Sequence, residues 1–136
     1  MLEELKQSVE TTAIFAAEAH YKGKGWSVLR VSRVRGDHSG YDFYLERGDE
    51  VRRVEVKGCS AIYGIPDLYE TEIDPETMLL VADELCVVYC SKDLQIPRIA
   101  VIPREEIPAM FVKPKLGYRI SGKFKSAKYM DKFFAN

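Results

Sequence analysis

The sequence lacks any apolar run that approaches the roughly 18 residues of a membrane-spanning helix. It also lacks the order of a secretory leader, in which basic residues precede an apolar core, because it opens with the acidic stretch MLEELKQSVE. We therefore expect no membrane partner and a cytoplasmic location. There is no low-complexity tract, and 46% hydrophobic residues in a chain of 136 predict a globular protein with a real core.

Cysteine and histidine are scarce, with three and two residues respectively. The cysteines, Cys59, Cys86 and Cys90, form no CxxC pair, and His20 and His38 fit no ligand spacing. This argues against a zinc site, which needs closely spaced sulfur and imidazole ligands. Two of the cysteines flank the apolar stretch LCVVYC, so we expect them to be small core residues.

An excess of basic charge is also missing, since the net charge is −1. The charge is nevertheless segregated. Residues 111–136 hold seven basic residues and one acidic residue, a net +6, which leaves −7 on residues 1–110. We expect the main domain to span 1–110 and a basic, aromatic C-terminal extension to span 111–136, packed on or beside it. The aromatic residues of the extension suit either stacking on nucleic acid or packing on the core.

Hydrophobic periodicity predicts a mixed α/β domain. Apolar residues at three-to-four spacing indicate a helix over residues 2–22 that ends near Gly23 and Gly25. Asp74-Pro75-Glu76 is typical of a helix start, and that helix should run to about residue 82. Alternating or apolar runs predict strands at 26–34, 41–46, 51–57, 85–90 and 98–102, with a short extended piece at 69–73 and a short helix at 104–110.

The clearest unit is the hairpin that joins residues 41–46 to residues 51–57. If Gly48 and Asp49 are its two loop residues, Asp42 lies directly opposite Glu55. In the same register Phe43 faces Val54, and Tyr41 faces Val56, on the other side of the sheet.

Two carboxylates placed opposite one another are about 5 Å apart and repel. The repulsion is roughly 1 kcal/mol in water and about 3 kcal/mol at an effective dielectric constant of 20. A divalent cation would turn this repulsion into attraction, so Asp42 and Glu55 are candidate metal ligands. Lys57 projects from the same face and could orient a nucleophilic water. The alternative is an ordinary charged hairpin face, on which Lys57 forms a surface ion pair.

These residues resemble a known family. Gly40-Tyr41-Asp42-Phe43, a short hairpin, and Val54-Glu55-Val56-Lys57-Gly58 resemble the D…ExK signature of the restriction-endonuclease-like, or PD-(D/E)XK, nuclease superfamily. The Gly-Tyr-Asp and Glu-Val-Lys-Gly residues of this motif are most similar to those of small Holliday-junction-resolvase-like and Mrr-like domains. The resemblance implies a restriction-endonuclease-like core in the order helix, three strands, helix, strand, with a central mixed sheet. Tyr41 stands where the family name has proline.

The family commonly adds an acid from its first helix, for which Glu10 and Glu18 are candidates. The strand after Gly25 runs about 26 Å before the chain turns back toward Asp42. Glu10 lies ~22 Å from Gly25 along the helix and Glu18 only ~10 Å. We therefore expect Glu10 in the site and Glu18 on the exposed side of the helix.

The resulting expectation is a Mg²⁺-dependent endonuclease that acts on DNA, with Mn²⁺ as a substitute and RNA not excluded. Cutting both strands of a duplex calls for two sites, which favours a homodimer. Weaker candidates for nucleic-acid contact are Lys24, Arg33, His38, Ser39, Lys123 and Lys125. Two alternatives stay open: a non-catalytic module of the same fold used for nucleic-acid binding or assembly, and an α/β domain of unrelated use.

Overall fold

The computed structural model describes residues 2–31, 40–60, 67–69, 72–77, 79–91, 95–107, 119–121 and 131–135. Its elements are α1 (Leu2–Gly23), β1 (Ser27–Arg30), β2 (Phe43–Arg47), β3 (Glu50–Cys59), β4 (Asp67–Tyr69), β5 (Glu84–Tyr89), β6 (Arg98–Pro103), the 3-10 turn η3 (Arg104–Glu106), β7 (Arg119–Ser121) and the 3-10 turn η4 (Asp131–Phe133).

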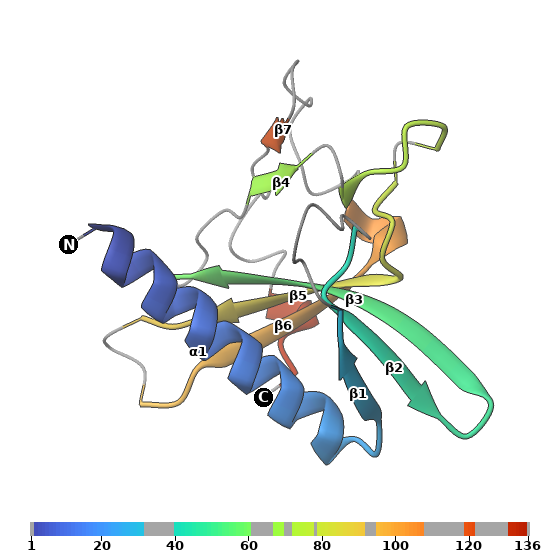
Figure 1. Ribbon diagram of the computed structural model, residues 1–136, viewed down its shortest axis with the longest axis horizontal. Coiled ribbons are helices and arrows are strands. Elements are labelled where there is room, and N and C mark those ends of the chain that lie inside the picture. Colours follow the sequence, from blue (N-terminus) through green and yellow to red (C-terminus); the bar gives the residue numbers. More distant parts are fainter. Residues whose placement is uncertain are drawn as a thin grey trace.

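The centre of the molecule is a five-stranded sheet in the order β1-β2-β3-β5-β6. β3 and β5 run parallel, and every other neighbouring pair in this sheet is antiparallel. The expected α/β class with a central mixed sheet is therefore confirmed. β4 and β7 form a separate two-stranded ladder, which lies away from the β2–β3 hairpin (Figure 1).

Each face of the central sheet carries its own hydrophobic core. α1 crosses one face (Figure 1) and buries Ala13, Ala17 and Tyr21 against Val54 and Val56 of β3. The opposite face is covered by residues that come after β3 and by the end of the chain. Its core contains Cys59, Leu68, Ile73, Leu80, Leu85, Val87, Tyr89, Ala100, Ile102 and Ile107, with Phe133 and Phe134 packed against it.

β3 serves both faces because successive side chains of a strand point to opposite sides. Val54 and Val56 pack toward α1, and at Gly58 the helix lies close to the strand. A Cβ atom at Gly58 would lie 2.9 Å from Cγ1 of Val9 and 3.0 Å from Cβ of Ala13. The absence of a side chain at this position therefore allows the helix to dock.

The hairpin has the predicted turn. Arg47 pairs with Glu50, so Gly48 and Asp49 are the two loop residues. Gly48 has a φ of 61°, which glycine adopts at little cost. The ladder continues without a slip to the pair Phe43–Val54. The turn chemistry read from the sequence is thus sufficient to fix the register of β2 on β3.

The prediction of a helix over residues 74–82 is wrong. Residues 75–77 form a turn, and Ile73 pairs with Leu80 as an isolated antiparallel bridge. The Asp74 carboxylate accepts a 2.9 Å hydrogen bond from the Glu76 amide, while the Asp74 amide donates to the Leu79 carbonyl. Asp followed by Pro suits the start of a turn as well as the start of a helix. Here the chain forms a turn because the Ile73–Leu80 bridge closes it.

Other expected elements are shorter than predicted or fall partly outside the described residues. β1 covers Ser27–Arg30 of the expected strand at 26–34, and residues 32–39 lie outside the described part. Of the expected helix at 104–110, the 3-10 turn η3 covers Arg104–Glu106, and residues 108–110 are outside it. Cys59 and Cys86 are buried, as expected of small core residues, and Cys90 is half-buried. None of the helices in the described part of the chain has the length and apolar character needed to cross a membrane.

The last residues of the chain return to the sheet. Phe134 forms a bridge with Ala100 of β6, and the Ala135 amide donates to the Ile99 carbonyl. The Phe134 ring lies 5.7 Å from the Tyr89 ring, and the Arg98 guanidinium lies 3.7 Å from the Phe134 centroid. Residues 131–135 therefore cover part of the face opposite α1.

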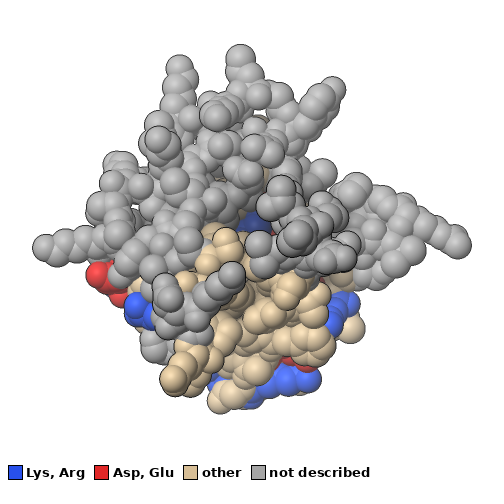
Figure 2. Space-filling model, turned by 90° about the vertical axis from the view of Figure 1, so that its left-hand side faces the viewer, with Lys and Arg blue, Asp and Glu red and all other residues tan. Residues whose placement is uncertain are grey.

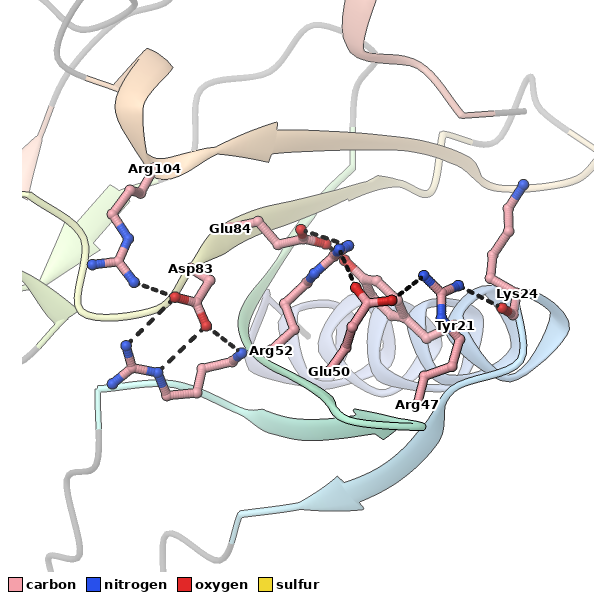
Figure 3. A network of polar contacts seen from close by, with 9 residues as sticks. Tyr21, Lys24, Arg47, Glu50, Arg52, Asp83, Glu84 and Arg104 are labelled. Carbon is pink, nitrogen blue, oxygen red and sulfur yellow. Dashed lines mark hydrogen bonds and ion pairs between the residues drawn. The ribbon is translucent and has the colours of Figure 1, made fainter.

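A buried polar network links α1 to the sheet (Figure 3). The Tyr21 hydroxyl donates a 2.5 Å hydrogen bond to Glu84, which also forms a 3.2 Å ion pair with Arg52. Burial raises the pKa of Glu84, and it also raises the pKa of Tyr21. The same figure shows Asp83 joined to Arg104, and Asp83 also forms a 3.5 Å ion pair with Arg53.

We expect Tyr21→Phe to lower the free energy of unfolding by about 1.5–3 kcal/mol, because it removes a buried hydrogen bond to a charged acceptor. Urea unfolding followed by circular dichroism measures the change. Tyr44→Phe, at a half-buried tyrosine of β2, is the matched control. Equal losses in the two variants would contradict the importance of the Tyr21–Glu84 contact.

Candidate active site

The two predicted acids come together where the β2–β3 ladder ends. The Asp42 amide donates to the Val54 carbonyl at 2.8 Å, and the Asp42 carboxylate accepts a 2.8 Å hydrogen bond from the Val56 amide. The Asp42 carbonyl accepts from the Val31 amide, so its backbone contacts both neighbouring strands. Asp42 is thus held against β3 at the level of Glu55.

This geometry departs from the regular pairing that the sequence predicts. In a continued ladder Asp42 would face Glu55 as a pair without mutual backbone hydrogen bonds, and Tyr41 would bond to Val56 with its side chain on the side of α1. Instead Tyr41 packs with the core on the opposite side, and the Arg53 guanidinium lies 5.8 Å from its ring centroid. The expected placement of Tyr41 is wrong because the backbone bends at Asp42, which turns its amide toward β3 and its carbonyl toward β1.

Both acids lie in a buried environment on the face away from α1. Glu55 is 1% exposed and Asp42 is 9% exposed. Glu55 alternates along β3 with Val54 and Val56, which pack toward the helix, and this places its side chain on the other side. An exposed, charged hairpin face is therefore excluded as the explanation of these residues.

Burial and the neighbouring charge of Asp42 raise the pKa of Glu55 to about 11. A hydrogen bond with Asp42 and the charge of Glu72 act in the same direction, whereas the charge of Lys57 opposes them. At neutral pH the proton of Glu55 therefore relieves the repulsion between the two carboxyl groups. A divalent cation at the same place would replace that proton.

Lys57 lies on the same face and is paired with a residue that sequence reasoning missed. Its Nζ is 2.8 Å from Oε2 of Glu72, and the two side chains are 14% and 4% exposed. Glu72 belongs to the segment after β4, for which the sequence predicts only a short extended piece at residues 69–73. Glu72 belongs to no sequence motif, because only the turn closed by the Ile73–Leu80 bridge brings it next to Lys57 on β3.

The donor set suits a hard cation with few protein ligands. Asp42 and Glu55 offer carboxylate oxygens, and Mg²⁺ is usually held by one or two carboxylates together with waters and substrate phosphates. Within the described ranges, no group of three or more His, Cys, Asp or Glu side chains is arranged to hold a metal ion. Asp42 and Glu55 by themselves would leave most coordination positions of such an ion to water and substrate.

The two candidate helix acids, Glu10 and Glu18, both belong to α1. Glu10 is exposed on α1, which packs on the face of the sheet opposite Glu55, and its role in the site stays a prediction. Glu18 pairs with Lys22 and Arg30 near the surface, in line with its expected exposed position.

The residues expected to contact nucleic acid are largely outside the described part of the chain. Lys24 is exposed, and its carbonyl accepts a hydrogen bond from Arg47. Figure 2 shows basic side chains at several separate places on the described part of one face, and not in a single patch. The remaining candidates, Arg33, His38, Ser39, Lys123 and Lys125, lie outside the described residues.

No protein-family model, curated protein or solved structure matches the chain.

Proposed function

We propose that this protein is a metal-dependent endonuclease of the restriction-endonuclease type, which hydrolyses phosphodiester bonds of DNA. One observation carries the proposal: Asp42 and Glu55, from two neighbouring segments of the sheet, are buried close together on the face that also holds Lys57. Two carboxylates and an amine in this arrangement form a minimal site for phosphodiester hydrolysis.

The arrangement of the strands supports the same proposal. The restriction-endonuclease resemblance implies a helix, three strands and, after a second helix, a further strand in a mixed sheet. Here α1 is followed by the antiparallel strands β1, β2 and β3, and β5 lies parallel to β3. The second helix has no counterpart between β3 and β5 among the described residues, where a turn and the short strand β4 take its place.

In the proposed reaction Asp42 and Glu55 would hold Mg²⁺ or Mn²⁺. When bound, the ion would supply Lewis-acid chemistry that activates water and phosphate for hydrolysis. Lys57 orients the attacking water and stabilises negative charge on the phosphate with its ammonium group. Buried surroundings strengthen each of these electrostatic contacts relative to water.

The test is a cleavage assay with Mg²⁺ or Mn²⁺ on linear duplex, branched and single-stranded DNA, with RNA included. We expect Lys57→Ala to lower the rate on the cleaved substrate by about 10²–10⁴-fold, the range for loss of one proton-transfer or orienting group. Lys22→Ala, an exposed lysine of α1, is the control and should cleave like the wild type. Equal rates for wild type and Lys57→Ala would overturn the proposal.

A second candidate function is a non-catalytic binding or assembly module of the same fold. The buried Lys57–Glu72 pair favours it, because an ion pair of this kind can also hold the turn on the sheet with no catalytic use of the amine. Calorimetric titration separates the two functions. A nuclease should bind Mg²⁺ or Mn²⁺ in a manner that Asp42→Asn abolishes, whereas a module of this kind should give no binding at Asp42 and Glu55.

A further inference from the structure

The Lys57–Glu72 ion pair joins a residue of the candidate site to a buried acid outside the sequence motif. Lys57 Nζ and Glu72 Oε2 are 2.8 Å apart, and the two side chains are 14% and 4% exposed. Lys57 follows Glu55 by two residues on β3, so its side chain leaves the same face of the strand as that acid, and its charge lowers the pKa of Glu55.

The backbone around Glu72 is fixed independently of Lys57. The Glu72 carbonyl accepts a 2.8 Å hydrogen bond from the Val81 amide, and the next residue, Ile73, bridges to Leu80. Ile73 and Leu80 are both buried in the core on this face of the sheet. The turn thus holds the Glu72 backbone in place next to Lys57. The ion pair therefore forms between a fixed acid and a single flexible side chain.

A lysine that orients water needs such a partner. Its ammonium group sits on a flexible stem with four carbons, and holding it in one place costs rotamer entropy. Positioning errors of about 1 Å can cost 10²-fold in rate. An anchored carboxylate at hydrogen-bond distance removes that freedom before substrate arrives.

We propose that Glu72 is a positioning residue of this site, which holds the Lys57 amine beside Glu55 and thereby sets where the attacking water is oriented. This inference rests on the proposed nuclease function. It assigns a role to a turn that lies far from the D…ExK motif in the sequence, and it makes no claim that Glu72 touches substrate or metal.

The experiment compares four forms of the full chain: wild type, Glu72→Gln, Lys57→Ala and the double variant. We expect Glu72→Gln to lower kcat by about 10²-fold, with KM and the Mg²⁺ affinity measured by calorimetry changed by no more than about threefold. The double variant should cleave no more slowly than Lys57→Ala alone, because Glu72 acts only through the amine. Losses that multiply in the double variant would overturn the proposal.

Glu84→Gln is the matched control, since Glu84 is also buried and paired with a cation but lies on the face of α1. Assays are run below the unfolding midpoint of every variant, and Glu84→Gln should keep the wild-type kcat. If Glu72→Gln does not fold, Glu72→Asp replaces it, because the shorter side chain keeps the charge but draws the amine away and should lower kcat similarly.

Failure of this inference and failure of the proposed function give different results. If Lys57→Ala is inactive while Glu72→Gln and Glu72→Asp cleave at the wild-type rate, the positioning role is overturned and the nuclease function stands. If Lys57→Ala cleaves like the wild type, or the wild type does not cleave, the nuclease function fails and this inference falls with it.

Discussion

Replacing Glu55 by glutamine should abolish metal-dependent cleavage and, at the same time, make the folded protein more stable at neutral and alkaline pH. Glutamine has the size of the buried glutamate and can still donate a hydrogen bond to Asp42, but it is neutral without taking up a proton on folding. The same change removes one of the two carboxylates that we assign to the cation. Stability and activity should therefore change in opposite directions.

The sign of the pH dependence follows from the raised pKa of Glu55. In the unfolded chain this group ionises near its ordinary pKa of 4.5, whereas the folded protein keeps the proton up to about pH 11. Between these values the folded state binds more protons than the unfolded state, so the stability contributed by this group falls as pH rises. The slope for one group is at most about 1.4 kcal/mol per pH unit.

Urea unfolding of wild type and Glu55→Gln at pH 5, 7 and 9 measures this effect. The advantage of the glutamine variant should be smallest at pH 5 and should grow at each higher pH. Glu46→Gln, at an exposed residue of β2, is the control and should show no such growth. Addition of Mg²⁺ should raise the unfolding temperature of the wild type but not of Glu55→Gln. A difference in stability that stays constant across the three pH values would contradict the buried, repelling pair.

Gly58→Val should be the most destabilising change to the core of this protein. The first atom of any side chain at this position would approach Val9 and Ala13 of α1 to 3.0 Å or less, and valine adds two methyl groups beyond it. The Val9 carbonyl oxygen, at 3.2 Å, belongs to the helix backbone and cannot turn aside. We expect a loss of about 3 kcal/mol, at the upper end of the range for overpacked cores, and a fall in unfolding temperature of roughly 10 °C.

Gly23→Ala is the matched control for this prediction. Gly23 lies at the end of α1, and a Cβ atom there would meet nothing within 4 Å. Alanine also favours the helix over glycine, so this variant should be at least as stable as the wild type. Thermal unfolding by circular dichroism compares the two. If Gly58→Val unfolds within a few degrees of Gly23→Ala, the close helix–strand contact is not a determinant of stability.

The sequence was sufficient to predict the parts of the fold that local chemistry determines. A two-residue Gly48-Asp49 turn fixes the hairpin register, and alternation along β3 separates Val54 and Val56 from Glu55. The long amphipathic pattern of α1 is equally local. These features depend on near neighbours in the chain, so they can be read without a structure.

Features that depend on distant segments could not be predicted. The Asp74-Pro75 pair suits both a helix start and a turn, and only the bridge between Ile73 and Leu80 decides between them. Glu72 reaches Lys57 because that turn packs on the sheet. The bend at Asp42, which moves Tyr41 to the opposite face, depends in the same way on hydrogen bonds to two neighbouring strands.

The alternation of β3 makes the protein unusually sensitive to small insertions and deletions. Loss of a single residue at the start of this strand would shift the parity of every position after it. Glu55 and Lys57 would then point into the hydrophobic core between α1 and the sheet, while Val56 would take the position of the acids on the other face. In-frame insertions or deletions of one residue at the start of β3 should therefore disrupt the core and the candidate site far more than substitutions at the same positions.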